Sequence, residues 1–248
     1  MTAIEIRNLT KKFGEHTAKE RVAVDSLTLS IERGELFALL GPNGAGKTTT
    51  IRMLCCLLAP TGGDAILLGD SITGNPGAVK RKINVSPQET AVAPNLSVRE
   101  NLEFIARIYG SDAGSARAVA GETLRRFGME DRARDRAKSL SGGLQRRLSI
   151  AMALISDPQI VFLDEPTLGL DVRARRELWK LLEELKGKIT IILTTHYLEE
   201  AEALSDRIAI IDTGRLKALG TARQIEEAAG KSSLEDAFLS LTEGGMVE

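Results

Sequence analysis

The segment GPNGAGKT at positions 41–48 has the residue types and spacing of a phosphate-binding loop. Its glycines let the backbone curl so that N–H groups converge on an anion, and a helix that starts directly after the loop adds positive potential. We expect Lys47 to contact the β- and γ-phosphates of a nucleotide and the Thr48 hydroxyl to ligate Mg²⁺. The residues expected to touch the nucleotide here are Gly41, Pro42, Asn43, Gly44, Ala45, Gly46, Lys47, Thr48 and Thr49.

Two adjacent carboxylates follow an apolar run in IVFLDEP, at 160–166. Parallel sheets bind ligands at the carboxyl ends of their strands, so a buried strand ending here would present both carboxylates to the phosphates. Asp164 would then hold the Mg²⁺ shell, and Glu165 would polarise an attacking water as general base. The alternative is that Glu165 only caps the backbone or pairs locally.

His196 follows another apolar run, at 189–193. A loop histidine is more often a cap or a surface residue. This loop, however, is expected to open onto the same sheet edge, where His196 could hydrogen-bond the γ-phosphate and orient the water. The sequence therefore makes it a candidate catalytic residue.

A second anion-binding pattern appears in LSGGLQ, at 140–145. Ser141, Gly142 and Gly143 stand directly before an apolar, helix-periodic run, which places backbone N–H groups at a helix N-terminus. The chain already has a complete phosphate loop nearly a hundred residues earlier, so the purpose of this second site is an open question.

Hydrophobic periodicity predicts the elements that position these residues. Ile4 and Ile6 alternate with polar residues, as do 27–31, and LFALL at 36–40 reads as a strand buried on both faces. A helix is predicted over 51–58, with Pro60 ending it. The middle, 89–157, reads as helical, and the last third returns to strand–helix alternation. We predict an α/β fold with a mostly parallel sheet, an N-terminal antiparallel β region and a helical lobe that carries LSGGLQ.

Composition excludes several classes of protein. The 33 basic and 34 acidic residues nearly cancel, so no nucleic-acid partner is expected. Cys55 and Cys56 are neighbours and point to different faces of a helix, which argues against a disulfide scaffold and for a reducing compartment. Met1 to Lys12 carries polar residues throughout, and no apolar run approaches the roughly 20 residues of a membrane span. We expect a soluble intracellular protein whose membrane role, if any, depends on a partner.

The ordered set GPNGAGKT, Gln88, LSGGLQ, IVFLDEP, Asp171 and His196 resembles the ATP-binding subunit of ABC transporters over essentially the whole chain. EPTLGLD and the ending SLEDAFLSLT are most similar to the subgroup that exports drugs, antibiotics or lipids. The resemblance implies a single ABC ATPase domain, 1–248, with a P-loop NTPase core at 1–88 and 158–220. It also implies a helical lobe at 89–157 and a C-terminal helical tail at 221–248.

The resemblance also implies roles for individual residues, with ATP and Mg²⁺ as cofactors. Phe13 matches the aromatic residue that stacks on adenine, and Gln88 matches the glutamine that senses Mg²⁺ and the attacking water. Asp171 matches the aspartate that reaches the partner's phosphate loop, and His196 matches the histidine that holds the γ-phosphate. Two features depart from the family pattern: Leu144 stands where glutamine is usual, and the stretch 15–22 is longer than usual.

In this family two chains pack head to tail, so Ser141, Gly142 and Gly143 of one chain would complete the site around Lys47 of the other. The resemblance thus implies a second ATP-binding subunit, polytopic membrane subunits and a place on the cytoplasmic, inner face of the membrane. The alternatives are a soluble ABC ATPase, for example in Fe–S cofactor assembly, and an inactive regulatory cassette. A GTPase is disfavoured because no N-K-x-D element for guanine is present.

Overall fold

The first two strands form an antiparallel hairpin, as the alternation of their apolar residues predicts. The computed structural model describes residues 1–14, 17 and 20–242, and the expectation of a longer loop at 15–22 falls largely outside them. β1 (Thr2–Phe13) pairs with β2 (Arg21–Glu32), while β4 (Gly62–Leu67) and β5 (Asp70–Ser71) extend the sheet in the order β2-β1-β4-β5. The expected antiparallel β region is therefore confirmed.

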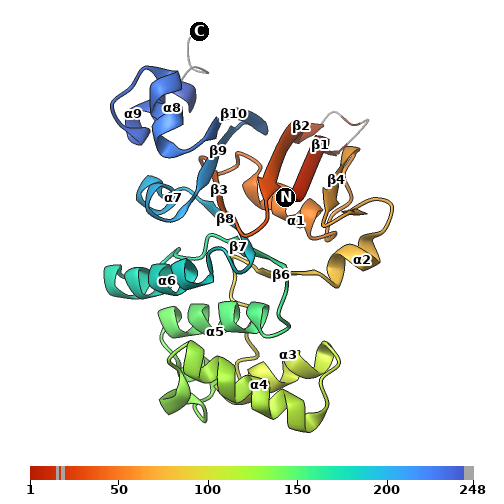
Figure 1. Ribbon diagram of the computed structural model, residues 1–248, viewed down its shortest axis with the longest axis vertical. Coiled ribbons are helices and arrows are strands. Elements are labelled where there is room, and N and C mark those ends of the chain that lie inside the picture. Colours follow the sequence, from red (N-terminus) through yellow and green to blue (C-terminus); the bar gives the residue numbers. More distant parts are fainter. Residues whose placement is uncertain (15–16, 18–19, 243–248) are drawn as a thin grey trace.

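A second, mostly parallel sheet crosses the centre of the molecule (Figure 1). Its strand order is β10-β9-β3-β8-β7-β6, and only β10 at the edge is antiparallel to its neighbour. The strands are β3 (Leu36–Leu40), β6 (Ile83–Ser86), β7 (Ile160–Asp164), β8 (Thr190–Thr195), β9 (Arg207–Asp212) and β10 (Arg215–Gly220). Every residue of β3, β7 and β8 is buried. The apolar residues of β3 and β7 therefore form continuous runs rather than alternating ones, and the central apolar residues of β8 lie between buried threonines.

Helices cover the central sheet and extend one end of the molecule. α3, α4 and α5 gather at the end far from β1 and β2, which confirms the expected helical lobe, and α8 and α9 lie at the opposite end (Figure 1). The helices are α1 (Lys47–Leu54), α2 (Pro76–Lys80), α3 (Val98–Ile108), α4 (Ala113–Arg126), α5 (Gly142–Leu154), α6 (Val172–Leu185), α7 (Leu198–Leu204), α8 (Ala222–Ala229) and α9 (Leu234–Thr242). Two short 3₁₀ turns, at Glu130–Arg132 and Ala137–Ser139, precede α5.

The two faces of the central sheet pack against different partners. Leu36, Ala38 and Leu40 of β3 belong to a core shared with the helical lobe and with α6 and α7. Phe37 and Leu39 point to the other face and pack into a core shared with the N-terminal sheet and α1. Because successive strand residues face opposite sides, one short strand connects the antiparallel β region to the helical layer.

The first helix is shorter than its apolar spacing predicts. The pattern from Ile51 to Leu58 fits a helix, but α1 ends at Leu54, and Cys56 has a φ of 55° in the left-handed region. That backbone conformation stops the helix well before Pro60. Cys55 and Cys56 are both free thiols. Within the described part of the chain, no helix is long and apolar enough to cross a membrane.

Candidate active site

The loop between β3 and α1 is held in a shape that only glycines allow. Gly44 and Gly46 have φ values of 84° and 104°, a region that residues with a side chain rarely adopt. A Cβ on Gly41 would collide with the carbonyl oxygen of Ile211, and one on Gly46 would collide with that of Ala23. The loop is therefore pressed against two neighbouring segments while α1 starts at Lys47.

Lys47 folds back over its own loop. Its ammonium donates hydrogen bonds to the carbonyl oxygens of Gly41 (2.7 Å) and Pro42 (3.1 Å), and it lies 3.9 Å from the Glu165 carboxylate. Only 5% of the residue is exposed. Burial lowers the pKa of Lys47, and the nearby Glu165 and Asp164 oppose this shift. A buried cation that is paired only with neutral carbonyl oxygens and a carboxylate at 3.9 Å favours an anionic ligand.

The two carboxylates at the end of β7 have different surroundings. Asp164 Oδ1 accepts hydrogen bonds from the hydroxyls of Thr48 (3.1 Å) and Thr194, which fix it beside the start of α1. Glu165 has a φ of 46°, a left-handed conformation that costs energy for a residue with a side chain. Its backbone N–H donates to the Thr194 hydroxyl at 3.0 Å. Strain held by such contacts is typical of a functional position.

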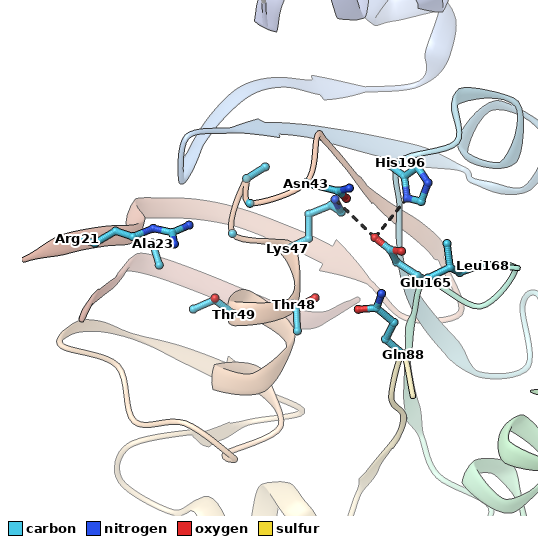
Figure 2. A pocket seen from close by; sticks show the side chains of 13 residues that line it. Arg21, Ala23, Asn43, Lys47, Thr48, Thr49, Gln88, Glu165, Leu168 and His196 are labelled. Carbon is cyan, nitrogen blue, oxygen red and sulfur yellow. Dashed lines mark ion pairs between the residues drawn. The ribbon is translucent and has the colours of Figure 1, made fainter. Parts of the chain in front are cut away.

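Glu165 points toward Lys47 on one side and His196 on the other (Figure 2). His196 Nδ1 lies 3.3 Å from Glu165 Oε1. Together with Gln88 they border a cavity of about 420 Å³ beside the loop. The residues lining it are Arg21, Ala23, Asn43, Gly44, Ala45, Gly46, Lys47, Thr48, Thr49, Gln88, Glu165, Leu168 and His196. Segments far apart in the sequence thus meet at one cavity.

A second cavity, of about 750 Å³, is bordered by another four of the predicted residues. Ser141, Gly142 and Gly143 border it at the start of α5, and Asp171 borders it at the start of α6. Ser141 and Asp171 are the N-caps of these helices, accepting from the N–H groups of Leu144 (3.4 Å) and Ala174 (2.8 Å). The structure therefore divides the predicted residues between two separate sites.

Packing accounts for Leu144. Its side chain is half-buried and packs against the hydrophobic core of the helical lobe while also bordering the second cavity. The following Gln145 donates to the Leu140 carbonyl oxygen at 3.2 Å. An apolar residue at this position contributes to packing and leaves Ser141 and both glycines at the cavity.

Phe13 is not among the residues that line the first cavity. It ends β1, is 43% exposed, and pairs with Arg21, which does line the cavity. The Lys11 ammonium lies 5.4 Å from the centre of its ring. The expected stacking of Phe13 on adenine remains a prediction.

Sequence reasoning missed Arg146 on the first turns of α5. It is 3% exposed and donates to the carbonyl oxygens of Pro166 (3.0 Å), Gln88 (3.2 Å), Pro87 and Asp164. Burial lowers its pKa to about 10, so the guanidinium is charged at neutral pH. The only sequence signal was an arginine in an apolar helix face.

Arg21 is the second residue that sequence reasoning missed. It stands at the first position of β2, where no motif marks it, and it reaches the cavity beside Gly44 (Figure 2). Its guanidinium adds positive charge to the rim of a cavity suited to phosphates.

The donor set fits a nucleotide with Mg²⁺. The glycine loop, Lys47 and the positive end of α1 suit phosphate groups. The Thr48 hydroxyl and Asp164 carboxylate are oxygen ligands of the kind Mg²⁺ prefers. Among the described residues, no group of three or more His, Cys, Asp or Glu could hold a metal. An ion here would therefore depend on phosphate oxygens and water for its other ligands.

Comparison with known proteins gives consistent results. A family model described as ABC transporter matches residues 24–168. The daunorubicin/doxorubicin resistance ATP-binding protein DrrA of Streptomyces peucetius is 44% identical over 94% of this chain and 69% of its own. The Nod factor export ATP-binding protein I of Burkholderia orbicola is 40% identical over 91% of this chain and 73% of its own.

A solved structure supports the same conclusion. The ATP-binding cassette MJ0796, described as dimeric, in a post-hydrolysis state and bound to ADP and Pi, has a TM-score of 0.80 at 27% identity. The alignment covers 88% of this chain and 98% of that one. The glycine loop, the parallel sheet and the carboxylates at its edge define an ATP-hydrolysing P-loop enzyme. More specifically, the chain belongs to the ABC transporter family.

Proposed function

We propose that this ATPase drives export through separate membrane subunits. The observation that carries the hydrolysis step is the position of Glu165, whose carboxylate faces Lys47 and His196 beside the glycine loop and whose backbone is left-handed. The names of the drug-resistance and Nod factor export relatives support export of a drug, antibiotic or lipid-like compound. These names disfavour the alternative in Fe–S cofactor assembly.

In this proposal each residue acts from its place in the cavity. Lys47 leaves the Gly41 and Pro42 carbonyls to bind the β- and γ-phosphates, and residues 41–49 hold the phosphate chain. Glu165 accepts the proton of the attacking water, while His196 and Gln88 orient the water and γ-phosphate. Thr48, Asp164 and Gln88 would hold Mg²⁺, and the ion would supply positive charge beside the phosphates. Phe13 stacks on the adenine.

The second cavity belongs to the site of another copy of the chain. Ser141, Gly142, Gly143 and Asp171 line a cavity separate from the first, yet they present a helix N-terminus suited to phosphate. A head-to-tail dimer would place this half-site over the glycine loop of its partner and form two equivalent composite sites. The dimeric MJ0796 cassette supports this arrangement.

The membrane subunits would supply the transport path, and the chain would sit on the inner face of the membrane through them. We treat residues 1–248 as one ABC ATPase domain, in which 1–88 and 158–220 form the core, 89–157 the lobe and 221–248 the tail. The end of that tail, 243–248, lies outside the described residues.

Replacing Glu165 with glutamine tests the assignment. Glu165→Gln should bind ATP but hydrolyse it at least about 100-fold more slowly, because a positioned general base contributes about 10²–10⁴-fold. Steady-state ATPase assays, nucleotide binding and size-exclusion chromatography with ATP would measure turnover, binding and dimer accumulation.

The matched control is Glu199→Gln, which removes the same charge from a position on α7 outside the first cavity. It should hydrolyse ATP at the wild-type rate. Wild-type turnover by Glu165→Gln would show that another group is the base. Association with membrane subunits would be tested by co-purifying the chain with a polytopic membrane protein.

A further inference from the structure

Glu200 is a carboxylate buried behind the active site, and the mechanism above does not use it. It lies on α7, four residues after His196, and its exposed fraction is 0%. Burial raises the pKa of Glu200, whereas Thr195, Thr167, Trp179 and Arg175 around it act in the opposite direction. Burying a carboxyl group costs free energy unless hydrogen bonds or an opposite charge compensate for the lost water.

Its neighbours come from three segments near the catalytic residues. Trp179 Nε1, on α6, donates to Glu200 Oε1 at 3.2 Å. Thr195 immediately precedes His196, and Thr167 lies in the loop between Glu165 and Asp171. One side chain therefore connects the end of β8, the loop after β7, and α6.

Helix α6 presents a stripe of residues to this region. Asp171, Arg175 and Trp179 are four residues apart, so they lie on one face of the helix. The Arg175 guanidinium lies 4.9 Å from the centre of the Tyr197 ring, and that ring lies 4.1 Å from the His196 ring. The helix capped by Asp171 is thus joined to the segment after His196 at two points, Arg175–Tyr197 and Trp179–Glu200.

Several polar atoms in this region are buried without a hydrogen-bond partner among the described residues. They include Glu200 Oε2, Thr167 Oγ1, Arg175 Nε and His196 Nδ1. Thr167 is close enough to affect the Glu200 carboxyl, but neither Thr167 Oγ1 nor Glu200 Oε2 completes a well-formed hydrogen bond. These unpaired donors and acceptors could form hydrogen bonds with one another if the side chains adopted a second arrangement.

We propose that Glu200 is a positioning residue that, through Trp179 and Thr195, couples the placement of His196 to that of the Asp171 segment. When ATP engages His196, the Glu200 junction transmits the movement to α6 and to the half-site that meets the partner chain. This inference rests on the proposed function, since it assigns a task to residues beside that site. Glu200 does not line the first cavity, so it acts only through its neighbours.

The chain supplies its own reporter, because Trp179 is its only tryptophan. In the wild-type protein, MgATP should change the intensity or wavelength of tryptophan emission. Glu200→Gln keeps the size of the side chain but removes its charge. It should diminish that response and lower kcat about tenfold, because hydrogen bonds to charged groups are worth about one to two powers of ten. KM for ATP should change little, since the glycine loop is untouched.

Glu199→Gln is the control, and it should match the wild type in kcat and emission. If Glu200→Gln does not fold, as judged by circular dichroism, Trp179→Phe replaces it: a smaller aromatic ring remains and the N–H donor is lost. Its kcat should fall about fivefold, and kcat is then the readout, because this variant has no tryptophan emission. If Glu200→Gln folds and has the wild-type kcat, the proposed junction is overturned. If Glu200→Gln does not fold, a wild-type kcat in Trp179→Phe overturns it. Absence of turnover in the wild type would instead overturn the proposed function. The tryptophan emission of Glu200→Gln would then test the junction independently of turnover. A diminished response to MgATP would support the junction, and an unchanged response would overturn it.

Discussion

The buried carboxyl group of Glu200 should make the free energy of unfolding of this chain depend on pH. The pKa of Glu200 is raised above its ordinary 4.5 in the folded protein, mainly by burial. The folded state therefore holds this proton more tightly than the unfolded state does. The stabilising contribution is full below about pH 4.5 and is lost as the pH rises through the folded pKa.

Glu200→Gln should remove this dependence. Relative to the wild type, the free energy of unfolding of the variant should increase as the pH rises from about 4.5 through the folded pKa of Glu200. Urea denaturation of both proteins over that pH range would measure the difference. A constant difference across the range would contradict the raised pKa.

Sequence motifs identified most of the residues at the first cavity, but not how they are held. Lys47 could be named from the spacing of the glycine-rich motif, and Glu165 and His196 because each follows an apolar run that predicts a buried strand. The left-handed conformation of Glu165 and the four carbonyls around Arg146 depend on contacts between distant segments. No local pattern encodes them, and the same is true of Glu200 and Trp179.

At the scale of elements, the buried strands and their order of alternation with helices were predictable from continuous apolar runs. Short edge elements such as β5, β6 and α2 were not, because their few residues take their structure from neighbours. α1 ended early for a similar reason: the apolar spacing to Leu58 continues, but the backbone turns at Cys56. Hydrophobic periodicity indicates which residues are buried, but it does not indicate where the backbone hydrogen bonds of a helix end.

The Arg146 side chain joins α5 to the loops that carry Gln88 and Pro166 and to the last residue of β7, Asp164. Arg146→Met should lower the free energy of unfolding by about 3 kcal/mol, because several buried carbonyl oxygens lose their donors. Arg147→Met is the matched control. Arg147 pairs with the more exposed Glu177, so its loss should cost about 1 kcal/mol or less. Equal losses in thermal or urea unfolding would show that the Arg146 contacts contribute no more than a surface pair.

At the scale of the whole molecule, the two cavities of one chain are each half of a site in the proposed head-to-tail dimer. A Ser141→Ala chain and a Lys47→Ala chain should each hydrolyse ATP poorly on their own. Mixed, they form a heterodimer in which one site carries both defects and the other carries neither, so partial turnover should return.

ATPase activity measured against the mixing ratio would test this, with the maximum expected near equal amounts. A mixture no more active than either variant, although heterodimers are present on a native gel, would argue against composite sites. The control is a mixture of two Lys47→Ala chains carrying different tags, which should stay inactive.

The separation of the two cavities on one chain also has a genetic consequence. A variant damaged only at Ser141 still folds and still offers its own glycine loop, so it would enter dimers with normal chains rather than be excluded from them. In a cell with both alleles, most dimers would then contain at least one damaged copy. Such an allele would reduce export even in the presence of a normal gene, whereas an allele that prevents folding would be recessive.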